Sequence, residues 1–193
     1  LIWFPLGIDL IVYTYNFFNA LLAMPLQLAL NLPLSSNVTL LVATMLSGFV
    51  AYLLALDVLR VTSVRDGHRP IHLAAVVAGL VFAFASNRAV YAALGHYNMV
   101  TTQWLPFYAL YFIRTLRRPT IRNACLAGLF FAFAALADMI FAAFLSILSV
   151  VLLLALWGSL RRRWSALACV LVSAVVAVLL WSPVLAPIVR GFA

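Results

Sequence analysis

NACLAGLFFAFAALADMIFAAFLSILSVVLLLALW, residues 123–157, is an almost unbroken apolar run of 35 residues. As a single helix it would be about 52 Å long at 1.5 Å per residue, well beyond the ~30 Å of hydrocarbon in a bilayer. Asp138 interrupts the run near its middle, and aspartate is a favoured residue at the start of a helix. The run therefore predicts two membrane-spanning helices, at about 121–137 and 139–159, that reverse direction at Asp138.

The whole chain has a similarly apolar composition. Of its 193 residues, 67% are hydrophobic and 8% are charged, and the mean hydropathy is +1.17. A soluble domain averages about 25% charged residues, and a soluble fold of this length has too little interior to bury so much apolar surface. The sequence therefore predicts an all-α, polytopic membrane protein embedded in membrane lipid.

Working outward from residues 123–157, the apolar runs predict six spans. Ser35-Ser36-Asn37 offers capping side chains for the first span, Pro70 suits the first turn of the second, and Pro183 and Pro187 end the last. The predicted spans cover about 37–60, 70–86, 100–116, 121–137, 139–159 and 165–182.

Residues 1–36 do not predict a span, because Pro5, Gly7, Pro25 and Pro33 interrupt them. Their aromatic residues are typical of a membrane interface. We expect an outer-face segment, 1–36, with an interfacial helix, followed by a transmembrane domain, 37–193. No signal peptide is visible before these residues, and both chain ends look cut, so we expect the chain to be part of a longer protein.

The charges predict the orientation. All twelve Lys+Arg residues are arginine, and they cluster at the ends of apolar runs and form no patch on a soluble face, so no nucleic-acid binding is predicted. The positive-inside rule places ten of them in the cytoplasm and leaves residues 86–99 and both chain ends outside the inner (plasma) membrane. Those ten are Arg60, Arg65, Arg69, Arg114, Arg117, Arg118, Arg122, Arg161, Arg162 and Arg163, whereas Arg88 and Arg190 fall on the outer side. Asp57, three residues before Arg60, predicts an ion pair within one helix.

The outer side contains one unusually polar stretch, SNRAVYAALGHYNMVTTQW, residues 86–104. Polar groups beside a membrane core are costly and mark functional sites. Arginine and histidine can bind phosphate oxygens, whereas amides and carboxylates can hold hydroxyl groups. The candidate substrate-binding residues are Arg88, His96, Tyr97, Asn98 and Gln103, and the weak catalytic candidates are Asp9 and Asp138.

Each of these residues also has a structural interpretation. Arg88, at a helix end, can extend to lipid headgroups, His96 after a glycine can occupy a turn, and Gln103 in a span can bond a neighbouring helix. Tyr97 and Trp104 can form part of an interfacial aromatic belt. Asp138 can cap a helix.

Several kinds of site are excluded. The chain has no phosphate-binding glycine-rich loop, no HExxH and no Gly-x-Ser-x-Gly motif. Its three histidines are too scattered for a metal site, so no cofactor is identified and nothing supports a divalent metal. Cys125 and Cys169 lie in apolar runs and are read as packing residues. Gly79–Ala83 and Gly128–Ala132 are small-residue pairs that favour close helix contact.

Three segments carry a family resemblance: FPLGIDLIVYTYNFFNALLAMPLQL, SSNVTLLVATMLSGFVAYLLALDVL and VAGLVFAFASNRAVYAALGHYNMVTTQWLPFYALYFIR. Over about residues 1–150 their pattern resembles bacterial membrane glycosyltransferases of the GT-C superfamily. The resemblance implies a polyprenyl-phosphate sugar donor, an acceptor at the outer face and inversion at the sugar carbon. It also implies a catalytic Asp or Glu in the first outer loop, which we expect upstream of Leu1; Asp9 lies in the corresponding loop.

Three functional hypotheses follow. The first is a GT-C-type transfer of sugar from a polyprenyl-phosphate donor. The second is a non-catalytic membrane subunit that packs against partner chains in a larger assembly. The third is a transporter, which ranks last because the polar groups lie near the ends of the spans and not at mid-depth.

Overall fold

The computed structural model describes residues 17–63, 71–161 and 163–191, and their regular secondary structure is entirely helical, as predicted. Asp9 and the predicted loop 64–70 lie outside the described residues. The helices are α1 (Phe17–Ala29), α2 (Leu32–Ser63), α3 (Ile71–Ala83), α4 (Ser86–Ala93), α5 (Tyr97–Val100), α6 (Trp104–Arg117), α7 (Ile121–Ala137), α8 (Met139–Leu160) and α9 (Trp164–Gly191).

Four stretches are long and apolar enough to cross a membrane: Leu32–Val61, Ile71–Ala93, Met139–Leu160 and Trp164–Val184. The chain is therefore a membrane-embedded protein. Helices α6 and α7 have 14 and 17 residues, fewer than the about 20 that a perpendicular span requires. The predicted reversal at Asp138 is confirmed, because α7 ends at Ala137 and α8 begins at Met139.

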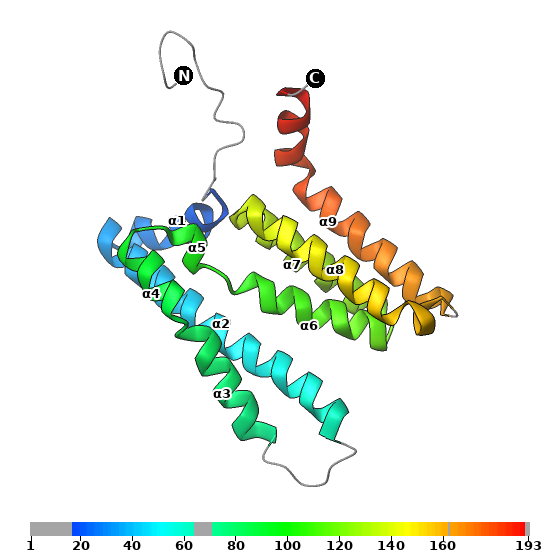
Figure 1. The fold of residues 1–193 in the computed structure, drawn as a ribbon. Helices are drawn as coiled ribbons and strands as arrows, with labels where there is room; N and C mark the ends of the chain where they lie inside the picture. Colours follow the sequence, from blue (N-terminus) through cyan, green and yellow to red (C-terminus); the bar gives the residue numbers. More distant parts are fainter. Residues whose placement is uncertain (1–16, 64–70, 162, 192–193) are drawn as a thin grey trace.

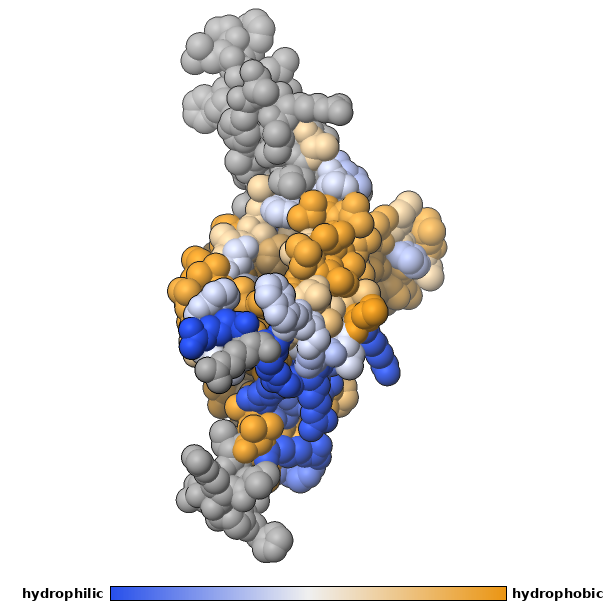
Figure 2. All heavy atoms as spheres, turned by 90° about the vertical axis from the view of Figure 1, so that its right-hand side faces the viewer, coloured by the Kyte–Doolittle hydropathy of each residue, from blue (hydrophilic) through white to orange (hydrophobic). Residues whose placement is uncertain are grey.

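The long helices run alternately between two ends of the molecule (Figure 1). Helix α2 forms a hairpin with α3, while α7 packs between α6 and α9 and also contacts α8. One end, called here the arginine-rich end, carries Arg60, Arg114, Arg117, Arg118, Arg122, Arg161 and Arg163. Hydrophilic residues gather toward this end below an apolar surface (Figure 2). The opposite end, called the α5 end, contains α1, α4, α5 and the start of α8.

The start of α2 corrects one prediction. The helix begins at Leu32, not at the Ser35-Ser36-Asn37 cap expected from the sequence. Asn31 supplies the cap, because its Oδ1 accepts a hydrogen bond from the Leu34 amide at 3.0 Å. Pro33 then occupies the first turn, where a missing backbone donor has no cost.

The prolines near the end of α9 correct a second prediction. Helix α9 passes through Pro183 and Pro187 and ends at Gly191, and its last part turns away from the axis of the rest (Figure 1). A proline removes one helical hydrogen bond and favours a kink, so it bends a membrane helix without necessarily ending it. The second predicted span differs in a similar way: α3 ends at Ala83, and the chain resumes as α4 from Ser86.

Two glycine contacts bring helices close together, as the small-residue pairs predict. A Cβ added to Gly79 would lie 2.7 Å from the Gly48 carbonyl oxygen, so α2 and α3 meet backbone to backbone. A Cβ added to Gly128 would lie 2.5 Å from the Ser173 carbonyl oxygen, which fixes α7 against α9. Close approach of this kind drives helix association where lipid removes the hydrophobic effect.

An aromatic cluster attaches α1 to the bundle. Phe18 of α1 lies 4.8 Å from Phe133 and 5.8 Å from Trp104 between ring centroids. Trp104 also lies 5.0 Å from Phe133 and 6.1 Å from Phe130. Such pairs add roughly 0.5–1.5 kcal/mol each beyond area burial. Trp104 is therefore half-buried, and these rings pack it against the hydrophobic core.

Asp57 corrects a third prediction. It forms no ion pair with Arg60; its Oδ1 accepts from Arg114 Nε at 2.9 Å, and its Oδ2 lies 3.7 Å from Arg117 Nη1. The bond therefore connects α2 to α6 at the arginine-rich end. The side chains of Asp57 and Arg114 are 24% and 37% exposed, so solvent screens the pair in part.

Replacing Asp57 by asparagine is expected to lower the unfolding midpoint in detergent by a few degrees, from a loss of roughly 1 kcal/mol. The loss arises because two neighbouring guanidinium groups lose their shared anion. The difference in unfolding midpoint between Asp57→Asn and wild type should be smaller at 0.5 M salt, because salt screens the ion pair. Arg118→Gln, at an exposed arginine of the same end, is the control and should leave the midpoint unchanged. Equal effects of the two variants would contradict a specific role for Asp57.

Candidate functional site

The polar stretch 86–104 contains two short helices, α4 and α5, which are separated by a turn. Helix α4 ends at Ala93, and Gly95 adopts a φ of 75°, a left-handed conformation that favours glycine. His96 follows it, and its backbone N–H donates to the Tyr91 carbonyl at 2.9 Å. This turn reverses the chain and sets α5, residues 97–100, beside the end of α4.

Arg88 is buried by this reversal. Its side chain is 5% exposed, which contradicts the predicted extension to lipid headgroups. Nη2 donates to the Val100 carbonyl at 2.7 Å, and Nη1 donates to the Thr102 hydroxyl at 2.9 Å. A longer contact of 3.5 Å joins Nη2 to the Thr44 hydroxyl on α2. Arg88 thereby connects α4, α2 and the C-terminal end of α5 with the residues that follow it.

The charge of Arg88 has no counter-charge in the described part of the chain. None of the ion pairs there includes it, and its Nε has no hydrogen-bond partner. Burying a cation is expensive unless it is paired. The side chain also lines a cavity of about 370 Å³ between α2 and the α3–α4 segment, together with Asn37, Thr44 and apolar residues. The site is therefore one cation at a cavity whose other lining residues are mostly apolar.

Asp138 is held on the other side of α5. It is 1% exposed, and its Oδ1 accepts from the Ile140 amide at 2.8 Å, which confirms the capping role at the start of α8. Its Oδ2 accepts from the Asn98 Nδ2 at 2.7 Å. Both carboxylate oxygens are thus occupied, and the positive end of the α8 dipole favours the charge.

A third polar contact joins α1 to α5. Asn19 Nδ2 donates to the Thr101 hydroxyl at 2.7 Å, and Thr101 donates in turn to the Tyr97 carbonyl at 2.9 Å. Asn19 and Thr101 are 4% and 1% exposed. The α5 segment is therefore the junction at which α1, α2, α4 and α8 are joined by hydrogen bonds.

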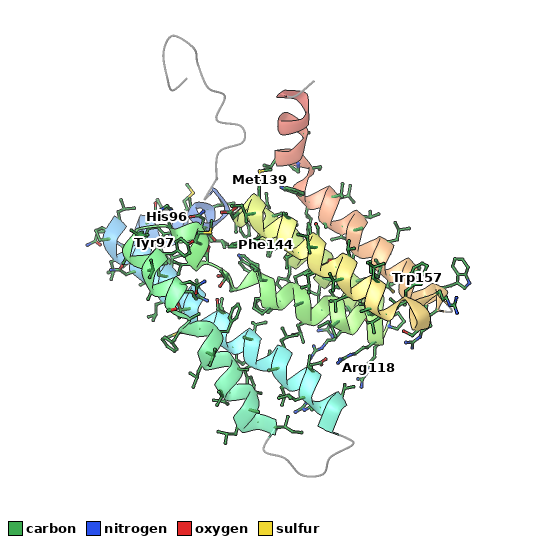
Figure 3. The ribbon with its side chains drawn as sticks, viewed as in Figure 1. His96, Tyr97, Arg118, Met139, Phe144 and Trp157 are labelled. Atoms are coloured by element: carbon green, nitrogen blue, oxygen red, sulfur yellow. The ribbon has the colours of Figure 1, made fainter. Side chains whose placement is uncertain are left out.

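The remaining candidates occupy different surroundings. His96 is exposed in the turn after Gly95, where its ring lies 6.0 Å from that of Tyr91. Tyr97 is half-buried, and both residues lie far from Arg118 of the arginine-rich end (Figure 3). Gln103 is 4% exposed, and its Oε1 has no partner, so the predicted bond to a neighbouring helix is not seen for that atom.

The stretch 86–104 therefore separates into distinct places. Asn98 and Asp138 come together directly, whereas Arg88 faces a cavity on the α2 side. In the described residues no group of three His, Cys, Asp or Glu side chains could hold a metal ion.

No family model, curated protein or solved structure matches the chain. The function must therefore be inferred from the site itself, and the resemblance to GT-C glycosyltransferases remains an expectation.

Sequence reasoning missed the hydroxyl groups that complete these contacts. Thr44, Thr101 and Thr102 each bind a side chain from another element. The spacing of polar residues in α2 could have indicated which faces of the helix make such contacts. Ser36 and Thr39 share one helix face, and Asn37 and Thr44 share another. Polar residues at helical spacing inside a predicted span mark the faces that lie toward protein and not toward lipid.

Proposed function

We propose that this chain is a multi-pass membrane protein that binds the phosphate of a polyprenyl-linked sugar at its outer face and transfers the sugar to an acceptor. In this proposal all six apolar helices cross the bilayer, and the short helices α6 and α7 do so where the hydrocarbon core is locally thinned. α1 lies at the outer interface. The arginine-rich end is cytoplasmic, and the α5 end faces outward across the inner membrane.

The observation that supports the proposal best is the buried, uncompensated guanidinium of Arg88 at an apolar cavity. An anion with a hydrocarbon tail suits both properties, because phosphate oxygens match the fork of arginine and the tail matches the cavity wall. Arg88 also lies only about five residues from the end of α4, which is roughly 7 Å of helix. A phosphate near the headgroup level is therefore within its reach.

The transfer step also requires a carboxylate to take the proton of the acceptor hydroxyl. Within the described residues, Asp57 binds Arg114 at the arginine-rich end, and Asp138 already accepts two hydrogen bonds. We therefore assign this role to a carboxylate outside the described residues. Asp9 is the candidate in this sequence.

Arg88→Gln tests the proposal. Purified protein in a zwitterionic detergent is titrated with polyprenyl phosphate, and retained lipid is measured by native mass spectrometry. The loss of charge-assisted bonds should weaken binding roughly 10- to 100-fold. Arg88→Lys keeps the charge but loses the forked geometry of the guanidinium group, so its affinity for polyprenyl phosphate should lie between those of wild type and Arg88→Gln. Sugar transfer from a polyprenyl-phosphate donor by the full-length protein should decline in parallel.

Two controls make the result specific. Arg118→Gln removes an exposed charge from the other end and should bind polyprenyl phosphate as wild type does. Polyprenol, which lacks the phosphate, should bind wild type and Arg88→Gln equally. Unchanged binding of polyprenyl phosphate by Arg88→Gln would reject a phosphate site at Arg88.

A non-catalytic membrane subunit is the second candidate. The hydrogen bonds of Asp138 favour it, because they give the one buried carboxylate of the described residues a structural task. This candidate predicts retention of the phosphate lipid without sugar transfer in the full-length protein. The transfer assay with wild type therefore decides between the two.

A further inference from the structure

A second cavity at the α5 end differs in chemistry from the Arg88 cavity. It has a volume of about 160 Å³ and lies between α1, α2 and α5. Its polar lining consists of Asn19, Gln27, Ser36, Thr39, Tyr97 and Thr101, and none of the lining residues is charged. In a chain that is 67% hydrophobic, this many hydrogen-bonding groups in one cavity is unusual.

The wall of this cavity is fixed by internal contacts. The Asn19–Thr101 hydrogen bond holds α1 to α5 at 2.7 Å, and Thr39 donates to the Ser35 carbonyl at 2.8 Å. Tyr97 and Ser36 are half-buried and Gln27 is exposed, and none of their side chains has a hydrogen-bond partner among the described residues. The cavity therefore combines the Asn19–Thr101 contact, which holds α1 to the end of α5, with hydroxyl and amide groups that are available to a ligand.

The lining selects the class of ligand. An ionised ligand would find no opposite charge there, and a hydrocarbon chain would leave the polar groups unsatisfied. A neutral molecule with several hydroxyl groups satisfies hydroxyl and amide side chains, which both donate and accept. The phenol ring of Tyr97 also offers an apolar face beside its hydroxyl group.

We propose that this cavity is a carbohydrate site for an uncharged sugar, with Gln27, Ser36 and Tyr97 as its ligand-binding residues. The inference deepens the function proposed above and rests on it for the kind of lipid that brings a sugar to this end. Its contacts are separate from those of Arg88, because Val100 lines the Arg88 cavity and Thr101 lines this one. The site can therefore be tested without any phosphate.

The test uses saturation-transfer NMR on the whole chain in a detergent without a sugar headgroup, since a glycoside detergent would compete. The probes are glucose, galactose, mannose and N-acetylglucosamine, with glucuronate and glucosamine as charged comparisons. At least one neutral sugar should give a saturable signal, and the charged sugars should give a weaker one. Gln27→Leu and Tyr97→Phe should each weaken the binding of that sugar roughly five-fold, which corresponds to one lost hydrogen bond.

Tyr91→Phe is the matched control, since it makes the same chemical change on α4, outside the cavity. It should bind the sugar as wild type does, and helical circular dichroism should be the same for all variants. The proposal is overturned if no neutral sugar binds, if Tyr97→Phe and Tyr91→Phe bind alike, or if charged sugars bind equally well. Because the probes lack phosphate, none of these outcomes depends on the role of Arg88.

Discussion

Gly128→Leu is expected to lower the unfolding midpoint in detergent by roughly 5–10 °C, through an overpacking cost of about 3 kcal/mol. The first added carbon would lie 2.5 Å from the Ser173 carbonyl oxygen and 2.8 Å from the Val176 Cβ. Neither neighbour is the free end of a flexible side chain. Helix α9 must therefore move away from α7, which removes the closest contact between them.

Gly158→Leu is the matched control for this prediction. A Cβ at Gly158 meets nothing within 4 Å, because the residue is exposed on α8. Glycine costs about 0.5–1 kcal/mol in a helix interior relative to alanine, so leucine at Gly158 should leave the midpoint unchanged or raise it. The same substitution is thus expected to act in opposite directions at two positions, as measured by thermal unfolding of both proteins. A similar fall at both would show that α7 and α9 do not depend on the Gly128 contact.

Asp138→Ala is expected to cost roughly 2–4 kcal/mol in the free energy of unfolding, because it removes two contacts at once. The loss of the α8 cap contributes about 1 kcal/mol. The loss of the acceptor for Asn98 leaves a part-buried amide unpaired, which costs about 1–3 kcal/mol more. Asp138→Asn keeps an oxygen for one of the two bonds and should lose less.

Thr120→Ala provides the comparison, since Thr120 caps α7 by accepting from the Asn123 amide at 3.3 Å and has no buried partner. Thr120→Ala should lower the free energy of unfolding only by the contribution of the α7 cap, about 1 kcal/mol. A double-mutant cycle of Asp138→Ala with Asn98→Ala, followed by denaturant unfolding in mixed micelles, should give a coupling energy of about 1 kcal/mol or more. No coupling, together with equal costs at Asp138 and Thr120, would mean that the Asn98 bond does not stabilise the α5 end.

The sequence predicts the helical class and the reversal at Asp138 because both depend on hydropathy and length alone. The apolar run 123–157 is too long for one span, and a single aspartate marks where it divides. Helix ends depend on weaker signals. Asn31 and Ser35 are both good caps, and only the packing of Ser35 in the interior, at 0% exposed, decides between them.

The contacts of the site are harder to predict because they join residues that are far apart in sequence. Local spacing pairs Asp57 with Arg60, yet the carboxylate binds Arg114 on another helix. Similarly, the burial of Arg88 depends on the Val100 carbonyl, which reaches it only because the chain reverses at Gly95. Residue types at the α5 end therefore indicate polar chemistry, while the division between a charged and an uncharged cavity requires the three-dimensional arrangement.

The hydrogen bonds of α5 also have a consequence for how the protein is made. Asn19 is synthesised 82 residues before its partner Thr101, and Asn98 is synthesised 40 residues before its partner Asp138. At roughly 5–20 residues per second of translation, the second interval alone is about 2–8 s. During that time the ribosome has delivered α5 to the membrane without its acceptor. The α5 end can therefore close only after α8 has begun to emerge, and a nascent chain stalled before Asp138 has an Asn98 amide without its acceptor.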